Sequence, residues 1–203
     1  MKSDILFIDI ETTGDPEAME YIEVKAPANY KDPEKIEAYL AEAKAEAFSK
    51  MALDPDYGKV LCIAYKEGDD QTEVLFDDEK KMLNTFWQLY GEHMQRVCGY
   101  NIIGFDLPFL LRRSFALGIT IPAMPPMAKY RVEPTIDLMG ILYNWANYKS
   151  LKFVCKRYGI KNPLPELNGS MVAQMDNDTL LKYAKNDVDM TYVLYLKMQG
   201  IYF

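Results

Sequence analysis

Short apolar runs of strand length dominate the first half of the chain. They are residues 4–10 (DILFIDI), 59–65 (KVLCIAY), 73–76 (EVLF) and 96–100 (RVCGY). Runs of this kind, rich in β-branched residues and bounded by turn residues, predict β-strands. Residues 12–16 (TTGDP) are expected to end the first strand, and residues 68–70 (GDD) predict a hairpin between the second and third.

Apolar residues at helical spacing dominate the second half. The predicted helices cover residues 78–94, 107–117, 138–145, 151–158 and 178–196. Clustered strands followed by helices, with a hairpin beside a strand–helix–strand pattern, favour an α/β fold in which helices flank a mixed sheet. At 203 residues, we expect one domain over residues 1–203, with no room for a polymerase domain.

Two segments look like additions to that scaffold. Residues 33–51 are rich in Ala, Glu and Lys and predict a helical insertion after the first strand, with one weakly apolar stripe. A surface helix docked on the core is the favoured interpretation, and a mobile lid is the alternative. Residues 121–134 contain four prolines and are expected to be irregular.

Composition narrows the possible functions. The formal net charge of −7 disfavours a protein that grips long duplexes by neutralising many phosphates. Cys62, Cys98 and Cys155 are too widely spaced for a zinc site, so we expect buried free thiols. No apolar run is long enough to cross a membrane, and no signal-peptide pattern begins the chain. We therefore expect a cytoplasmic protein with no membrane partner.

Two carboxylates share one face of the first predicted strand. Asp9 and Glu11 are two residues apart, so both side chains point to the same side. Their mutual repulsion would favour a bound cation such as Mg²⁺ or Mn²⁺, which prefer carboxylate oxygens. The alternative is that the pair marks an exposed strand end.

A third carboxylate follows the fourth predicted strand. In residues 99–108 (GYNIIGFDLP) a strand ends, a turn follows and a helix begins. Asp106 is placed either to cap that helix or to deliver a carboxylate to the mouth of the sheet.

The last predicted helix contains Tyr183 and Asp187. They lie four residues apart and therefore share a helix face. Asp in mid-helix is a poor helix former, which indicates either a solvated position or a functional one. Tyr183 has the alternative of being an ordinary buried tyrosine.

In this order, the three motifs resemble those of the DEDD superfamily of 3′-5′ exonucleases. The motifs are FIDIETTG (residues 7–14), NIIGFD (101–106) and YAKND (183–187), the last typical of the tyrosine variant, DEDDy. Nearly the whole chain is similar to the bacterial and phage family related to the proofreading exonuclease domain of B-family DNA polymerases. The only histidine, His93, is far in sequence from Asp187, which agrees with the tyrosine variant.

The resemblance implies an RNase H-like fold and hydrolysis with two Mg²⁺ or Mn²⁺ ions per active site. Asp9 would bridge both ions, Glu11 and Asp187 would complete one site, and Asp106 would hold the second ion, largely through water. Tyr183 would position the attacking water, because its ordinary pKa makes it a poor general base.

The resemblance also implies a substrate cleft. The implied contacts to the terminal nucleotide of single-stranded DNA are Thr12, Thr13, Gly14, Asn101 and Phe105. Phe105 would either stack on a base or lie in the core. The product would be a nucleoside 5′-monophosphate.

Several alternatives stay open at this point. The same chemistry could act on RNA 3′ ends, or the chain could be an inactive nucleic-acid-binding module. Lys149, Lys152 and Lys156 share a helix face that is interpreted as solvated rather than as a phosphate track. Replication or repair proteins are the expected partners if the substrate is delivered by another protein.

Overall fold

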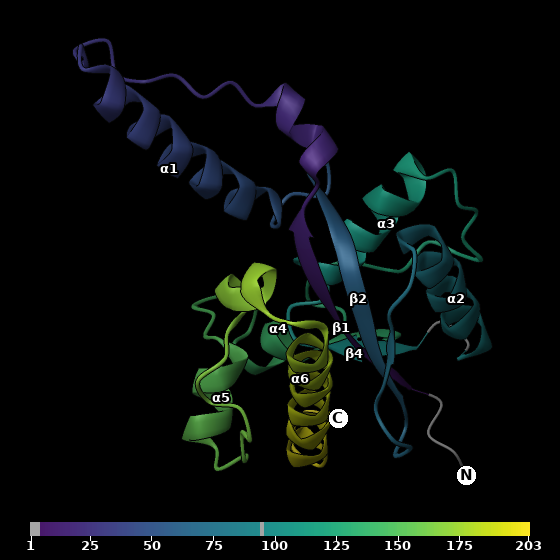
Figure 1. The fold of residues 1–203 in the computed structure, drawn as a ribbon. Coiled ribbons are helices and arrows are strands. Elements are labelled where there is room, and N and C mark those ends of the chain that lie inside the picture. The colour runs from purple at the N-terminus through teal and green to yellow at the C-terminus, as the bar shows by residue number, and fades with distance from the viewer. Residues whose placement is uncertain (1–4, 94–95) are drawn as a thin grey trace.

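One mixed sheet organises the molecule. The computed structural model describes residues 5–93 and 96–203, and its sheet has the strand order β3-β2-β1-β4-β5 (Figure 1). The strands are β1 (Leu6–Gly14), β2 (Gly58–Glu67), β3 (Glu73–Leu75), β4 (Val97–Gly99) and β5 (Thr135–Asp137). The β1/β2 and β2/β3 pairs are antiparallel, whereas β1/β4 and β4/β5 are parallel. The predicted mixed sheet and its hairpin are therefore confirmed.

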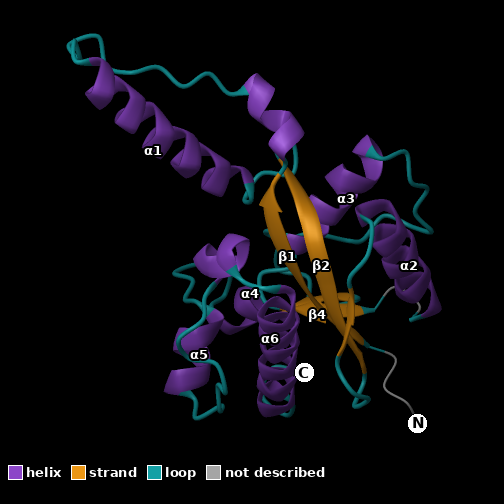
Figure 2. Ribbon diagram, viewed as in Figure 1, coloured by secondary structure: helices purple, strands orange, loops and turns teal. Residues whose placement is uncertain are grey.

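Helices cover both faces of this sheet (Figure 2). Among the described residues, the α-helices are α1 (Pro33–Met51), α2 (Glu79–Glu92), α3 (Asp106–Ala116), α4 (Leu138–Leu142), α5 (Leu151–Arg157) and α6 (Asn177–Met198). The 3₁₀ helices are η1 (Pro16–Tyr21) and η2 (Gly169–Gln174). In the described part of the chain, no helix is long and apolar enough to span a membrane.

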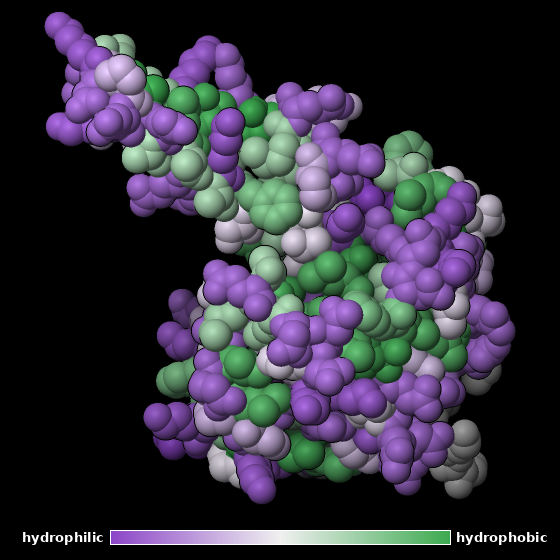
Figure 3. Space-filling model, in the orientation of Figure 1, coloured by the Kyte–Doolittle hydropathy of each residue, from purple (hydrophilic) through white to green (hydrophobic). Residues whose placement is uncertain are grey.

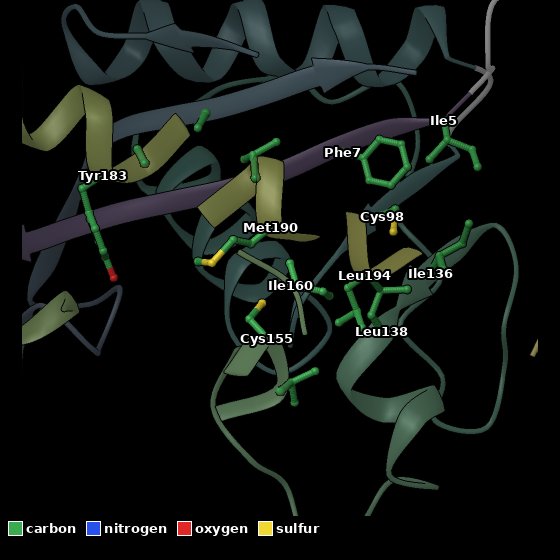
Figure 4. Packing of buried hydrophobic residues seen from close by; sticks show 14 of the residues in the cluster. Ile5, Phe7, Cys98, Ile136, Leu138, Cys155, Ile160, Tyr183, Met190 and Leu194 are labelled. Atoms are coloured by element: carbon green, nitrogen blue, oxygen red, sulfur yellow. The ribbon is translucent and has the colours of Figure 1, made fainter. Parts of the chain in front are cut away.

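Alternation along β1 divides the core into two clusters. Leu6, Ile8 and Ile10 pack with α2 and α3 on one face. Ile5 and Phe7 pack on the other face with α4, α5 and α6, as the close-up in Figure 4 shows. The three cysteines are buried free thiols, as predicted, and burial raises the pKa of each.

Some predicted boundaries are wrong. β1 does not end before Thr12, because residues 12–14 continue to pair with β2. β5 was not predicted, since its three residues directly follow the proline-rich stretch and are too few for a period-2 pattern. α4 ends at Leu142 rather than at residue 145, because the backbones of Asn144 and Trp145 have positive φ. Asp4 and Met94, at the ends of two predicted elements, lie outside the described residues.

The inserted helix α1 does not dock on the core. Met51, at its last position, is its one buried residue, and Figures 1 and 3 show the helix projecting from the body above an open notch. α1 packs instead beside its own connecting segment, where the rings of Tyr30 and Tyr39 lie 5.6 Å apart. Its alanine-rich stripe offers too little apolar area to stabilise a docked position. Residues 15–51 are hereafter called the arm.

Phe7 is the residue whose loss should most disturb the α6 face. It is fully buried, and its ring centroid lies 5.2 Å from those of both Tyr192 and Tyr195. Phe7→Ala should lower the free energy of unfolding by about 3–5 kcal/mol in denaturant titrations. Phe115→Ala is the matched control, because Phe115 is 89% exposed and its change should stay within about 0.5 kcal/mol. Equal effects of the two substitutions would contradict this packing.

Candidate active site

Asp9 and Glu11 lie on the face of β1 that packs against α6. They share this face with Phe7, which contacts two tyrosines of that helix. Asp9 is partly buried and Glu11 is 7% exposed. The interpretation as an exposed strand end is therefore wrong, because β1 runs on to Gly14.

α6 brings Asp187 to the same place. One carboxylate oxygen from each of Asp9, Glu11 and Asp187 lies within 4.8 Å of the other two. Burial raises the pKa of Asp187, and a side-chain hydrogen bond from Tyr183, one helical turn earlier, offsets part of that rise. Figure 4 shows Tyr183 at the opposite end of the buried cluster from Phe7. Spacing along the strand and along the helix thus correctly predicted the shared face within each pair, whereas the meeting of the two pairs was implied only by the family resemblance.

Asp187 has a second neighbour that fixes its position. The buried amide of Asn186 lies 3.4 Å from the Asp187 carboxylate and donates a 3.1 Å hydrogen bond to Asn162 Oδ1. Asn162 lies in the loop after α5, so this contact ties α6 to that loop beside the carboxylates. Asp187 is therefore held by contacts with two residues of its own helix, Tyr183 and Asn186.

Asp106 does not cap α3. Phe105 occupies the cap position without a side-chain hydrogen bond, and Asp106 is the first helical residue. The Asp106 carboxylate accepts a 3.1 Å hydrogen bond from the backbone N–H of Ile10, across 96 residues of sequence. β4 ends at Gly99 and pairs only with the beginning of β1, which leaves the N–H of Ile10 without a strand partner on that side. The carboxylate thus lies against the strand that carries Asp9 and Glu11.

Burial raises the pKa of all four carboxyl groups, and nearby negative charges add to the rise at Asp9, Glu11 and Asp106. Burial is the largest cause of the raised pKa of Asp9, followed by the negative charges of Asp106, Glu11 and Asp187. The pKa of Glu11 is raised by burial and by Asp187 and Asp106. Burial raises the pKa of Asp106 to about 7 and also raises that of Asp187. Shifts of this kind concentrate at functional sites.

Asp137 organises the loop that delivers Asp106. It is buried, and its carboxylate accepts hydrogen bonds from the backbone N–H groups of Asn101, Ile103 and Gly140 at 3.0–3.1 Å. The hydrogen bond with Gly140 caps α4 at the predicted helix start, whereas the two hydrogen bonds with the 101–103 turn were not predicted. A cap residue before a short apolar run was the only sequence signal of this role.

Lys152 is closer to the site than the sequence indicated. Its Nζ lies 5.8 Å from the centre of the Tyr183 ring, and its charge offsets part of the rise in the Asp187 pKa that burial causes. It is partly buried, while Lys149 and Lys156 are exposed. The interpretation of a solvated lysine face therefore holds for two of the three residues and is wrong for Lys152. The spacing of residues along α5 does not indicate how far Lys152 lies from α6.

The first three predicted substrate contacts lie where β1 meets the arm. The hydroxyl of Thr12 donates a 2.5 Å hydrogen bond to the carbonyl of Ala52, while Thr13 is partly exposed. At Gly14, a Cβ atom would approach the carbonyl oxygen of Phe48 to 2.7 Å, so only glycine fits. Their contacts with a nucleotide stay a prediction, and in this structure Thr12 and Gly14 anchor the arm.

The other two predicted substrate contacts lie in the loop before α3. Asn101 has a positive φ of 68°, and a Cβ atom at Gly104 would clash with its side-chain oxygen at 2.3 Å. Phe105 is partly buried, packs against the α2/α3 cluster and has its ring 5.6 Å from that of Phe109. The core interpretation of Phe105 is therefore confirmed for part of its surface. A base contact on the rest stays a prediction.

The donor set fits hard divalent cations. Asp9, Glu11 and Asp187 present converging oxygen atoms, and Asp106 adds a nearby carboxylate. Oxygen-only ligands suit Mg²⁺ and Mn²⁺, and a bound cation would offset the repulsion that adds to the raised pKa of Asp9 and Glu11. In the described residues, no histidine or cysteine belongs to the cluster.

Comparison with protein families gives a direct match. Residues 59–202 match the family described as a predicted 3′-5′ exonuclease related to the exonuclease domain of PolB. The chain belongs to this family. The matched residues include Asp106, Tyr183 and Asp187, while Asp9 and Glu11 precede them. The structure joins the two parts, since one carboxylate oxygen of Asp187 lies within 4.8 Å of those of Asp9 and Glu11. Asp106 reaches the same strand through the hydrogen bond that it accepts from Ile10.

Individual relatives agree with this family. The chain is 22% identical over 157 residues to a DNA polymerase of Archaeoglobus fulgidus, covering 70% of this chain and 20% of that protein. Its fold is similar to that of the family B DNA polymerase of the hyperthermophilic archaeon Pyrobaculum calidifontis, with a TM-score of 0.62 and 22% identity. That match covers 96% of this chain and 24% of the polymerase chain. The chain thus spans about a fifth to a quarter of these relatives, and the predicted RNase H-like exonuclease fold is confirmed.

The raised pKa values predict an unusual pH dependence of stability without metal. Each carboxyl group binds its proton more tightly in the folded protein than in the unfolded chain, whose carboxyl pKa lies near 4. Stability in EDTA should therefore fall as pH rises from 5 to 8, by at least about 2 kcal/mol in urea titrations.

Asp106→Asn should reduce this slope and stabilise the metal-free protein at pH 8. The amide oxygen of Asn can still accept the hydrogen bond from Ile10, so the substitution removes mainly the charge. Asp69→Asn, at an exposed aspartate outside the cluster, is the control and should leave the slope unchanged. A stability that is flat or rises from pH 5 to 8 would exclude strain from buried like charges.

Proposed function

We propose that this protein is a metal-dependent 3′-5′ exodeoxyribonuclease that releases nucleoside 5′-monophosphates from single-stranded DNA. The observation that carries the proposal is the convergence of Asp9, Glu11 and Asp187 within 4.8 Å, beside Asp106, in a chain of the PolB-like exonuclease family. A structural role does not account for so many buried, mutually repelling carboxylates at one point. The DNA substrate is supported by the relatives, which are DNA polymerases.

The four carboxylates would hold two divalent ions. Glu11 and Asp187 would bind one ion, Asp106 the other, and Asp9 both. When bound, such ions lower the pKa of a water molecule and stabilise charge on the oxygens of an in-line displacement at phosphorus. The chain itself positions the ligands: Ile10 orients Asp106 through its N–H, and Tyr183 and Asn186 orient Asp187.

Tyr183 acts in this proposal as a hydrogen-bond donor rather than as a base. Burial is the largest cause of the raised pKa of its hydroxyl group, followed by the negative charges of Asp187 and Glu11. The hydroxyl therefore stays protonated throughout the neutral range and can direct its hydrogen at Asp187 or at the attacking water. Lys152 beside the ring adds a positive charge where negative charge develops during hydrolysis.

The central prediction is metal-dependent shortening of single-stranded DNA from its 3′ end. A 5′-labelled oligonucleotide should give a ladder with Mg²⁺ or Mn²⁺ and none with EDTA. Asp9→Asn should abolish the ladder, because it removes the charge shared by both proposed ion sites. Asp69→Asn is the matched control with expected full activity.

Two outcomes of that assay would change the proposal. A ladder on matched RNA but not on DNA would reassign the substrate to RNA 3′ ends. No cleavage of either strand, together with no increase in melting temperature on adding Mn²⁺, would favour an inactive nucleic-acid-binding module.

Removal of the Tyr183 hydroxyl should slow turnover without preventing folding. Tyr183→Phe keeps the ring and should lower kcat about 10- to 100-fold, the usual effect of losing a group that orients a metal ligand. The loss should be equal from pH 6 to pH 9, because the hydroxyl stays protonated there. Tyr158→Phe, on an exposed tyrosine after α5, is the control. A changed shape of the pH–rate profile would instead assign Tyr183 as a base.

A further inference from the structure

A small pocket lies against the loop that delivers Asp106 and has no role in the chemistry described so far. Its volume is about 150 Å³, and its lining includes Asn101, Lys129, Asp137, Trp145 and Tyr148. Asn101 begins the loop that ends at Asp106, so one short segment contacts both the pocket and the carboxylates. The pocket and the proposed cleavage site therefore share residues 101–106 as a common boundary.

The aromatic wall of this pocket is rigidly built. The ring of Trp145 lies directly on Gly140, where an added Cβ atom would approach the ring to 2.6 Å. The backbone N–H of Trp145 donates a 2.8 Å hydrogen bond to the Gly140 carbonyl, and the ring of Tyr130 lies 5.9 Å away, edge-on. Asp137 joins the base of the pocket to the 101–103 turn through its hydrogen bonds.

The backbone around the pocket is strained. Asn101, Tyr130, Asn144, Trp145 and Asn147 all have positive φ between 49° and 68°. These five are all of the non-glycine residues with positive φ in the described part of the chain. Trp145 belongs to the aromatic wall, and Asn144 and Asn147 each directly precede one of its aromatic residues. Such strain persists only where surrounding contacts enforce it, and it gathers at binding sites.

Charge also concentrates along this side of the chain. Residues 129–161 contain seven basic and two acidic residues, although the whole protein has a net charge of −7. Of the two acidic side chains, Asp137 is buried and Glu133 pairs with Arg96 at 2.7 Å. Lys129 and Lys149 are exposed, and among the described residues neither forms an ion pair. Cations beside exposed aromatic rings match the composition of single-strand binding surfaces.

We propose that this pocket binds an unpaired base of the DNA strand, on the 5′ side of the nucleotide being removed. This inference rests on the proposed function. The terminal phosphodiester must reach the carboxylates, so any further contact with the strand involves nucleotides upstream of it. The base stacks against Trp145 and Tyr148, and Lys129 faces the adjoining phosphate. The subsite would hold the strand in place but take no part in bond cleavage.

Tryptophan fluorescence offers a direct test of binding. The chain has two tryptophans, and Trp87 is 2% exposed with its indole N–H bonded to Ser114 Oγ at 2.7 Å. Single-stranded oligonucleotides, added in Ca²⁺ to prevent turnover, should quench the emission of Trp145 alone. Oligonucleotides with one abasic site, moved stepwise from the 3′ end, should lose the quenching at one upstream position. Quenching that is absent, or equal for every abasic position, would overturn the proposal.

Kinetics separate this subsite from the cleavage chemistry. Tyr148→Ala should raise KM for a long oligonucleotide about tenfold, the scale of one stacking contact, with little change in kcat. Hydrolysis of the p-nitrophenyl ester of thymidine 5′-monophosphate, which is too short to reach the pocket, should be unchanged. Tyr148 is 42% exposed, so its truncation should not impair folding, and Tyr158→Ala is the control at a similarly exposed tyrosine.

The possible results are distinct. An unchanged KM in Tyr148→Ala would overturn the subsite while leaving the proposed function intact. Failure of the wild-type protein to hydrolyse either substrate would overturn the proposed function, and fluorescence would still report on the pocket. A matched RNA that quenches as well as DNA supports base binding and shows that the pocket does not select the sugar.

Discussion

Mutual repulsion among four clustered carboxylates, two of them buried and two partly buried, is the constraint on which the rest of this structure depends. Asp9, Glu11 and Asp187 hold oxygen atoms within 4.8 Å of one another, with Asp106 close enough to raise the pKa of Asp9. Without other contacts to hold them, such like-charged carboxylates would move apart or bind protons. The elements that carry them must therefore be fixed by contacts that have nothing to do with charge.

Packing on both faces of β1 provides that fixation. Its even-numbered residues, Leu6, Ile8 and Ile10, bind the strand to α2 and α3, while Phe7 locks α6 on the opposite face. The same strand thus carries two of the carboxylates and sets the distance to Asp187. Because β4 pairs only with the start of β1, the backbone of Ile10 stays open to receive Asp106. One strand, β1, therefore determines both the packing of the two core clusters and the position of the site.

The sequence predicted those parts of the site whose geometry depends only on residues close together in the chain. The two-residue spacing of Asp9 and Glu11, and the four-residue spacing of Tyr183 and Asp187, predicted shared faces correctly because strand and helix periods are fixed. The role of Asp106 could not be derived in this way, because capping a helix and bonding to Ile10 require the same local sequence. That choice depends on β4 being only three residues long.

Contacts between segments far apart in the sequence could not be predicted either, because they also depend on how the chain folds. The hydrogen bonds that Asp137 accepts from the 101–103 turn join residues 34 and 36 positions apart, and no periodicity in the sequence indicates them. The position of Lys152 depends on how α5 packs beside α6. The helical nature of residues 33–51 was correctly predicted, but not their projection from the body, since helix propensity says nothing about where a helix docks.

The arm and the basic segment together suggest how a strand approaches the site. Residues 15–51 carry nine acidic and five basic residues and are anchored where Thr12 meets Ala52, at the end of β1. A phosphate backbone would be repelled by this arm and attracted by residues 129–161. In an acidic protein, the path of a nucleic acid is set by such local differences rather than by net charge. The arm then disfavours a bound phosphate backbone, whereas the basic segment, which lines the pocket with Lys129 and Tyr148, favours one.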